Sequence, residues 1–251
     1  LFLIVEDSND LRGYMVNILN SHFHIIEAAD GKEGFRKAIQ KIPDLIISDL
    51  MMPKMDGLEL CQQLKQHEVT SHIPVVLLTA KANIESRLEG LSIGADDYLT
   101  KPFNAEELQI RASNLITQRQ KLRDRYSRTV VLKPKDIAIT PMDEAFLEKI
   151  MTVVENNLSN TDFKVEEFQK EIGLSRMQLH RKIKSLTGHS TTEFMRHQRL
   201  IRAAELLANH AGNVSDICYA VGFNSLPYFT KSFKEVYGVT PSDYTKGAEN
   251  N

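Results

Sequence analysis

The stretch that decides the fold of the first half of the chain is Leu45-Ile46-Ile47-Ser48-Asp49-Leu50-Met51-Met52-Pro53-Lys54-Met55-Asp56-Gly57. Its beginning is apolar and rich in isoleucine, which predicts a short buried strand. Pro53 cannot donate a backbone hydrogen bond and Asp56-Gly57 is a turn signal, so a loop is predicted after the strand. Asp49 therefore stands at the carboxyl end of a buried strand, where open α/β sheets bind ligands.

Strand-like runs alternate with helical patterns along the first half of the chain. The expected strands are residues 1–5, 24–28, 45–48, 75–78 and 98–99, and the expected helices are residues 9–19, 32–42, 58–66, 84–91 and 105–123. Five β/α units predict a parallel sheet with helices on both faces. The first strand ends in Glu6-Asp7, so three carboxylates converge if this strand lies beside the strand of Asp49.

The residues at the strand ends predict chemistry on a phosphoryl group. Carboxylates that converge repel one another unless a cation or protons compensate, and Mg²⁺ prefers one or two carboxylates with waters and phosphate. Glu6 and Asp7 would hold the cation, and Asp49 would be the nucleophile that forms an acyl phosphate. Lys101 and Mg²⁺ would neutralise the phosphoryl group, and Thr79 would offer it a hydroxyl. Taken singly, these residues would be solvated acids, a helix cap and a surface lysine.

Five short motifs occur together in this half. They are Val5-Glu6-Asp7, Asp49 to Gly57 as quoted above, Leu78-Thr79-Ala80-Lys81, Gly94-Ala95-Asp96-Asp97-Tyr98 and Lys101-Pro102-Phe103. With these motifs, residues 1–122 resemble the receiver domain of two-component response regulators. The resemblance implies a five-stranded, parallel, doubly wound α/β sheet in the flavodoxin-like order 2-1-3-4-5.

The resemblance also implies the roles of particular residues. Asp49 would be phosphorylated, and Thr79 and Tyr98 would form a switch pair. The implied Mg²⁺ ligands are Glu6, Asp7, Asp49 and the carbonyl oxygen of Met51. Glu6 departs from the pattern, because Asp is commoner there and the longer side chain changes the reach to the metal. A competing chemistry is that of aspartyl-phosphate hydrolases of the haloacid dehalogenase type, which need a second Asp two residues after the nucleophile. Met51 occupies that position and cannot donate a proton.

The composition is that of a soluble globular chain of about two domains. It has 251 residues, of which 42% are hydrophobic and 25% charged, and domains usually have ~100–150 residues. No apolar run approaches the ~18 residues of a spanning helix and no signal peptide is evident, so no membrane contact of this fragment is expected. Cys61 and Cys218 lie far apart in apolar patterns. They predict buried thiols in a reducing compartment, without a disulfide or a metal site.

Charge divides the chain into an acidic and a basic part. Residues 1–118 hold 11 Lys+Arg and 17 Asp+Glu, whereas residues 119–251 hold 20 and 16. This asymmetry predicts different partners for the two parts. Residues 123–141 contain prolines and no clean period, so they are predicted to be a linker, and residues 142–251 a second domain.

The second domain contains one structural unit twice, at residues 165–184 and 214–234. Each unit is a short helical pattern, a Gly that ends it, and a second helix that opens at Ser. Gly173 and Gly222 suit the positive φ of a helix C-terminus. Ser175 with Gln178 and Ser190 with Glu193 form capping-box patterns. These are features of a helix-turn-helix, whose second helix enters the major groove of DNA.

A basic face supports DNA binding by the first unit. Leu179, Ile183 and Leu186 form the apolar stripe of its second helix, and Met177 could either pack or reach the groove. Residues 176–202 hold seven Lys+Arg against one acid, Glu193. The other face of the helix offers Arg176, Gln178, His180, Arg181 and Lys184. One basic helix alone would more often be a solvated face. Two such units joined by a helix at 191–209 favour phosphate contacts for affinity and base-edge contacts for specificity.

The tandem arrangement resembles the AraC-type DNA-binding domain, on Ile217-Cys218-Tyr219-Ala220-Val221-Gly222-Phe223, Phe229-Thr230-Lys231-Ser232-Phe233-Lys234 and Gly238-Val239-Thr240-Pro241-Ser242-Asp243-Tyr244. The base-contacting positions that the resemblance implies are Met177, His180, Arg181, Leu226, Pro227, Tyr228 and Lys231. Because Leu226-Pro227 is poor in hydrogen-bonding groups, Asn224, Ser225 and Lys231 are expected to contact mainly phosphates.

A receiver followed by an AraC-type domain is expected to be a phosphorylation-controlled transcription regulator and not an enzyme. The expected partners are a histidine kinase domain, double-stranded DNA and, in the active state, a second copy of the chain. The arrangement resembles the C-terminal part of a hybrid two-component regulator. This fragment is expected to be cytoplasmic, and the full-length chain could be anchored in the inner membrane. The alternatives are a stand-alone response regulator and a relay or docking module whose basic domain binds protein.

Overall fold

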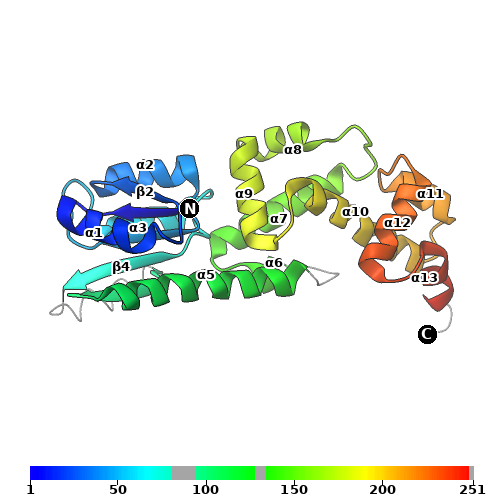
Figure 1. Ribbon diagram of the computed structural model, residues 1–251. Helices are drawn as coiled ribbons and strands as arrows, with labels where there is room; N and C mark the ends of the chain where they lie inside the picture. The colour runs from blue at the N-terminus through cyan, green and yellow to red at the C-terminus, as the bar shows by residue number, and fades with distance from the viewer. Residues whose placement is uncertain (81–93, 128–133, 249–251) are drawn as a thin grey trace. The chain divides into compact units, whose positions relative to one another are not determined.

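The computed structural model describes residues 1–80, 94–127 and 134–248 (Figure 1). The chain forms two compact units. The first consists of Leu1–Leu122 with Ile139–Asp143, and the second of Arg123–Ala138 with Glu144–Asn251. None of the helices in the described ranges is long and apolar enough to cross a bilayer.

The first unit is built on a five-stranded parallel sheet in the order β2-β1-β3-β4-β5. This confirms the predicted fold and strand order. The strands are β1 (Phe2–Val5), β2 (Ile25–Ala28), β3 (Leu45–Asp49), β4 (Val75–Ala80) and β5 (Asp97–Lys101). Val5 pairs with Ser48 in register, so Glu6 and Asp49 follow neighbouring positions at the same edge.

Helices cover both faces of the sheet. They are α1 (Asn9–Leu19), α2 (Gly31–Lys41), α3 (Gly57–Gln66) and α5 (Ala105–Ser127). The apolar residues of α1 and α5 pack with the β-strand side chains of one face, and α2 packs against α3 and β1. Ser8, Asp30 and Asp56 cap the first three helices through their side-chain oxygens. The helix predicted at residues 84–91 lies outside the described residues.

The segment predicted to be a linker is partly helical. Helix α5 continues to Ser127, four residues beyond its expected end, and α6 (Pro134–Ile137) forms a single turn. Helix α7 (Pro141–Asn156) already begins at the last linker residue. The segment predicted to be a linker therefore includes helical residues, which its sequence does not indicate. Pro134 and Pro141 each stand at the first position of a helix, where a missing backbone N–H costs nothing.

In its described residues, the second unit has helices but no strands, and it has two hydrophobic cores. The remaining helices are α8 (Val165–Ile172), α9 (Arg176–Thr187), α10 (Thr191–Ala208), α11 (Val214–Ala220), α12 (Leu226–Tyr237) and α13 (Pro241–Ala248). The first core joins α7, α8 and α9 with the start of α10, through Phe194 and Met195. The second joins the end of α10 to α11 and α12. Figure 1 shows α10 passing from one helix-turn-helix to the other.

The turns have the geometry that the sequence predicts. Gly173 and Gly222 have φ of 83° and 80°, in the left-handed region. A Cβ on Gly222 would also lie 2.1 Å from the carbonyl oxygen of Leu158, so the second turn needs Gly for space as well as for conformation. Both predicted capping boxes are present, at the starts of α9 and α10. Cys61 and Cys218 are buried free thiols.

Candidate functional site

Three carboxylates meet at the carboxyl edge of the sheet in the first unit. Glu6 and Asp49 are 1% and 7% exposed, whereas Asp7 is open to solvent. One oxygen from each of the three lies within 4.8 Å of the others. Parallel pairing of β1 with β3 produces this convergence, because both strands end at the same level of the sheet. The expected acidic cluster is therefore present.

Lys101 reaches this cluster from the end of β5. Its Nζ lies 2.7 Å from Asp49 Oδ1 and 3.0 Å from Glu6 Oε2. Burial raises the pKa of Glu6, and the hydrogen bond from Lys101 opposes that rise. The backbone N–H of Ser8 also donates to Glu6, and that of Leu50 donates to Asp49 Oδ1 at 2.9 Å. These donors hold both buried acids in fixed orientations.

The donor set suits a hard divalent cation. All three ligand atoms are carboxylate oxygens, and the exposed Asp7 leaves one side of the cluster open to water and to a further ligand. Mg²⁺ takes this combination of one or more carboxylates and waters. The role predicted for Met51 belongs to its backbone carbonyl, because Mg²⁺ takes oxygen ligands and not a thioether sulfur.

Thr79 and Tyr98 lie on the neighbouring strands β4 and β5. Thr79 is 4% exposed, and its hydroxyl donates to the carbonyl oxygen of Ala80 at 3.2 Å. Tyr98 is 6% exposed and pairs in register with Leu77, two residues before Thr79. Both side chains are thus inside the unit, near the predicted phosphoacceptor edge. Their role as a switch pair stays a prediction.

In the second unit, α9 carries the expected polar face. Leu179, Ile183 and Leu186 are buried in the first core. Met177 is 47% exposed and belongs to the outer face, which decides between its two predicted orientations. The other candidate residues are exposed or half-buried: Arg176, Gln178, His180, Arg181 and Lys184. Gln178 accepts a hydrogen bond from the backbone N–H of Ser175, so its side-chain oxygen closes the capping box.

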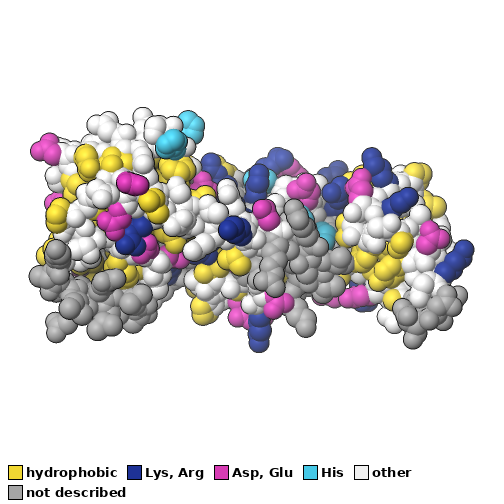
Figure 2. Space-filling view, turned by 60° about the horizontal axis from the view of Figure 1, so that its bottom comes forward, with side chains coloured by type: hydrophobic (Ala, Val, Ile, Leu, Met, Phe, Trp, Pro, Cys, Tyr) yellow, Lys and Arg dark blue, Asp and Glu magenta, His cyan; other side chains and the backbone are white. Residues whose placement is uncertain are grey.

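Helix α12 presents the corresponding face of the second helix-turn-helix. The exposed candidates are Asn224, Pro227, Tyr228 and Lys231. Ser225 caps the helix by accepting from the N–H of Tyr228, and Leu226 packs against the second core. Leu226 is thereby less available for a base contact than the resemblance implies. Figure 2 shows Lys and Arg side chains gathered along the upper edge of the second unit.

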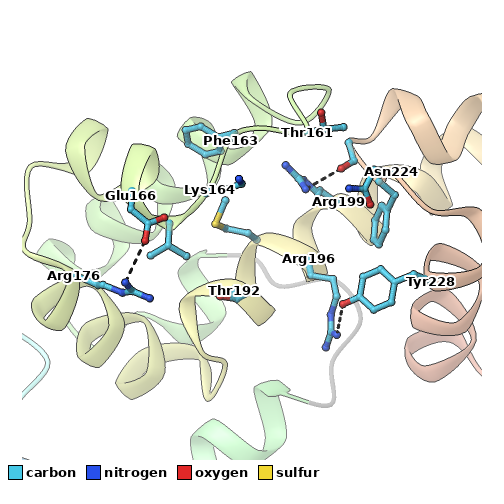
Figure 3. A pocket seen from close by; sticks show the side chains of 14 residues that line it. Thr161, Phe163, Lys164, Glu166, Arg176, Thr192, Arg196, Arg199, Asn224 and Tyr228 are labelled. Carbon is cyan, nitrogen blue, oxygen red and sulfur yellow. Dashed lines mark hydrogen bonds and ion pairs between the residues drawn. The ribbon is translucent and has the colours of Figure 1, made fainter.

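A hollow of about 360 Å³ lies between the two helix-turn-helices (Figure 3). Three of its lining residues were predicted DNA contacts, namely Arg176, Asn224 and Tyr228. Three further basic residues line it without having been singled out from the sequence: Lys164, Arg196 and Arg199. The excess of Lys and Arg in residues 176–202 indicates a basic surface that includes Arg196 and Arg199. It does not predict which of these basic side chains line the hollow.

Two matches to family models divide the chain in the same way as the structure. Residues 2–113 match the response regulator receiver domain, and residues 169–247 match a helix-turn-helix domain. The second match covers both of the repeated units except for the first residues of α8.

The relatives are of two kinds. Histidine kinase P4 of Formosa agariphila is 43% identical over 96% of the chain, which spans only 18% of that protein's length. Response regulator ArlR of Staphylococcus saprophyticus is 37% identical, over 58% of the chain and 70% of that protein. Among solved structures, the receiver domain of a signal transduction histidine kinase from Syntrophus aciditrophicus is 36% identical. It matches 47% of the chain and 89% of its own length, with a TM-score of 0.45.

Proposed function

The chain belongs to the response regulators, with a receiver domain followed by an AraC-type helix-turn-helix domain, and we propose that phosphorylation of Asp49 controls its binding to DNA. The observation that carries the proposal is the position of Asp49. Its Oδ1 lies 2.7 Å from Lys101 Nζ, beside the two other carboxylates of the acidic cluster.

The chemistry is a transfer of one phosphoryl group. An oxygen of Asp49 attacks the phosphorus of a phosphohistidine, the P–N bond breaks, and an acyl phosphate forms on Asp49. Mg²⁺ held by Glu6, Asp7, Asp49 and the Met51 carbonyl would neutralise charge on the phosphoryl oxygens. Lys101 would move from the carboxylate to the new phosphoryl group, to which its cation is attracted.

The phosphodonor in this proposal is a histidine kinase domain. The match of 96% of the chain to a much longer histidine kinase supports a kinase domain upstream in the same full-length protein. The match to ArlR supports the alternative, a response regulator that receives its phosphoryl group from a separate kinase. In either case the chain would work in the cytoplasm, a reducing compartment that suits its free thiols.

Intact-mass measurement after treatment with acetyl phosphate and Mg²⁺ tests the phosphoacceptor. Wild type should gain one phosphoryl group and Asp49→Asn none. Asp10→Asn, an exposed acid in the first turn of α1, is the matched control and should behave as wild type. Phosphorylation of Asp49→Asn to the wild-type extent would overturn the assignment.

The output of the proposed switch is a change in dimerisation and in DNA binding. A phosphoryl oxygen on Asp49 would attract the Thr79 hydroxyl, and Tyr98 would follow into the vacated space. The added charge would bias an equilibrium between two receiver conformations that already exist. The dimer face is expected near the fourth helix of the receiver, predicted at residues 84–91, which lie outside the described residues. Salt-dependent binding of a DNA duplex separates this function from that of a relay module, which would show none.

A further inference from the structure

The hollow between the two helix-turn-helices has an apolar floor and a basic rim. Phe163, Met195 and Phe223 are buried beneath it. Lys164 and Arg196 lie on the rim without an acidic partner within ion-pair distance among the described residues. Arg176 is also on the rim, 3.2 Å from Glu166, which is the one acid among the described residues that line the hollow. The rim therefore carries a net positive charge.

A second hollow, of about 390 Å³, adjoins the first. It is lined by Met177 and His180 of α9 and by residues at the start of α10. Val165, Arg176 and Thr192 line both hollows. One concave surface thus runs from the predicted base-contacting residues of α9, across α10, to Asn224 just before α12 and to Tyr228 within it.

We propose that this concave surface binds the DNA sugar–phosphate backbone between the two major grooves, and that Arg196 of α10 contacts one of its phosphates. The proposal rests on the DNA-binding function proposed above and adds a third contacting helix to it. When two recognition helices lie in successive major grooves on one side of a duplex, the backbone between those grooves must pass over the surface that joins the helices. Here that surface belongs to the first half of α10.

The three arginines of α10 differ in what their guanidinium groups contact. Arg199 donates to the carbonyl oxygens of Gly222 and Asn160, both at 3.0 Å, and fixes the second turn against α10. Arg202 is paired with Glu205 at 2.8 Å. Arg196 makes one hydrogen bond within the described residues, from Nη1 to the hydroxyl of Tyr228 at 3.1 Å. Arg196 lines the hollow, and Figure 3 shows its guanidinium group beside the Tyr228 hydroxyl.

The contact with Tyr228 ties Arg196 to the helix that contacts bases. The hydrogen bond joins α10 to α12 across 32 residues of sequence. An arginine that is already oriented by one hydrogen bond loses less conformational freedom when it binds a phosphate. Tyr228 is therefore a positioning residue for Arg196, in addition to any contact of its own with a base.

The test is a titration of the full chain against two duplexes at several salt concentrations. One duplex is selected by the wild-type chain from a random pool, and the other is a scrambled version of it. Arg196→Ala should lower the salt dependence, the slope of log affinity against log salt, by about one unit. One lost phosphate contact also predicts a roughly five- to tenfold weaker affinity for both duplexes at ~0.1 M salt.

Two further variants complete the design. Arg196→Lys keeps the charge and should retain the wild-type slope. Arg202→Ala removes an arginine of the same helix whose charge is already paired, and it should leave the slope unchanged. A melting temperature of Arg196→Ala equal to that of wild type shows that the comparison concerns binding and not folding.

The outcomes separate this proposal from the general function. If wild type enriches no sequence from the random pool and binds no duplex, the proposed DNA-binding function fails and this proposal fails with it. If wild type binds and Arg196→Ala has the wild-type slope, only the role of Arg196 is refuted. A loss confined to the selected duplex also refutes it, because a phosphate contact carries no base preference.

Discussion

Replacing Gly57 by Ala should displace Asp49, the proposed phosphoacceptor. Gly57 begins α3, at the far end of the loop that follows Asp49. Its N–H donates to the carbonyl oxygen of Leu50 at 2.9 Å. A Cβ there would lie 2.2 Å from the carbonyl oxygen of Asp49 and 2.9 Å from Leu50 Cα. Since ordinary contacts of this kind are 3.4–4 Å, the helix and the end of β3 would have to separate by more than an ångström.

The size of the effect follows from two opposing contributions. Overpacking of a tight site costs ~1–3 kcal/mol. Ala favours a helix over Gly by up to about 1 kcal/mol, and by less at a helix end. The atoms in the way belong to the backbone and cannot rotate aside, so we expect a net loss of roughly 1–2 kcal/mol in the free energy of unfolding of the receiver domain. The displaced Asp49 should also be phosphorylated more slowly.

Urea unfolding followed by far-UV circular dichroism measures the change, since the chain has no Trp to report by fluorescence. Gly13→Ala is the matched control. Gly13 lies inside α1 with nothing within 4 Å of its added Cβ, so this variant should be stabilised by ~0.5–1 kcal/mol. If Gly57→Ala is as stable as wild type and accepts phosphate at the same rate, the close approach at Asp49 does not constrain the site.

Four other substitutions test separate parts of the molecule. Thr79→Ala should still accept phosphate but should not dimerise on phosphorylation. If light scattering shows that the phosphorylated variant dimerises as much as phosphorylated wild type, the proposed switch is contradicted. Burial lowers the pKa of His197 to about 4, so as the pH falls below ~6.5 the unfolded chain binds a proton before the folded chain does. His197→Phe should therefore lose less stability than wild type between about pH 7 and about pH 5, by roughly 2 kcal/mol in urea unfolding. If wild type and His197→Phe lose the same free energy of unfolding over this pH range, the pKa of His197 is not lowered in the folded chain. Arg181→Ala should cost ~1–3 kcal/mol on the selected duplex and relax preference at one base pair, whereas Lys231→Ala should weaken selected and scrambled duplexes alike. Equal losses for Arg181→Ala on both duplexes would show that it does not contact a base.

By itself, the sequence determined the features that depend on neighbours along the chain. Apolar runs that end in Asp49 or in Glu6-Asp7 predict strands whose charged ends must meet at one edge, because parallel strands end on the same side of a sheet. The repeated Gly and Ser positions predict two helix-turn-helices for a similarly local reason, since caps and positive φ act within one turn of a helix. Helix α6 was missed because a single turn has no period to detect.

Only the tertiary structure decided what each charged side chain contacts. Lys101 lies between Asp49 and Glu6, which are 52 and 95 residues away in the sequence. Arg196, Arg199 and Arg202 recur at a spacing of three residues on α10, and their local sequence does not distinguish them. Their partners are a tyrosine hydroxyl on another helix, two backbone carbonyls of distant turns, and a glutamate of the same helix. Contacts between residues far apart in sequence set the partners of Arg196 and Arg199, whereas Arg202 pairs locally. Arg196 thereby lines the hollow where DNA is proposed to bind.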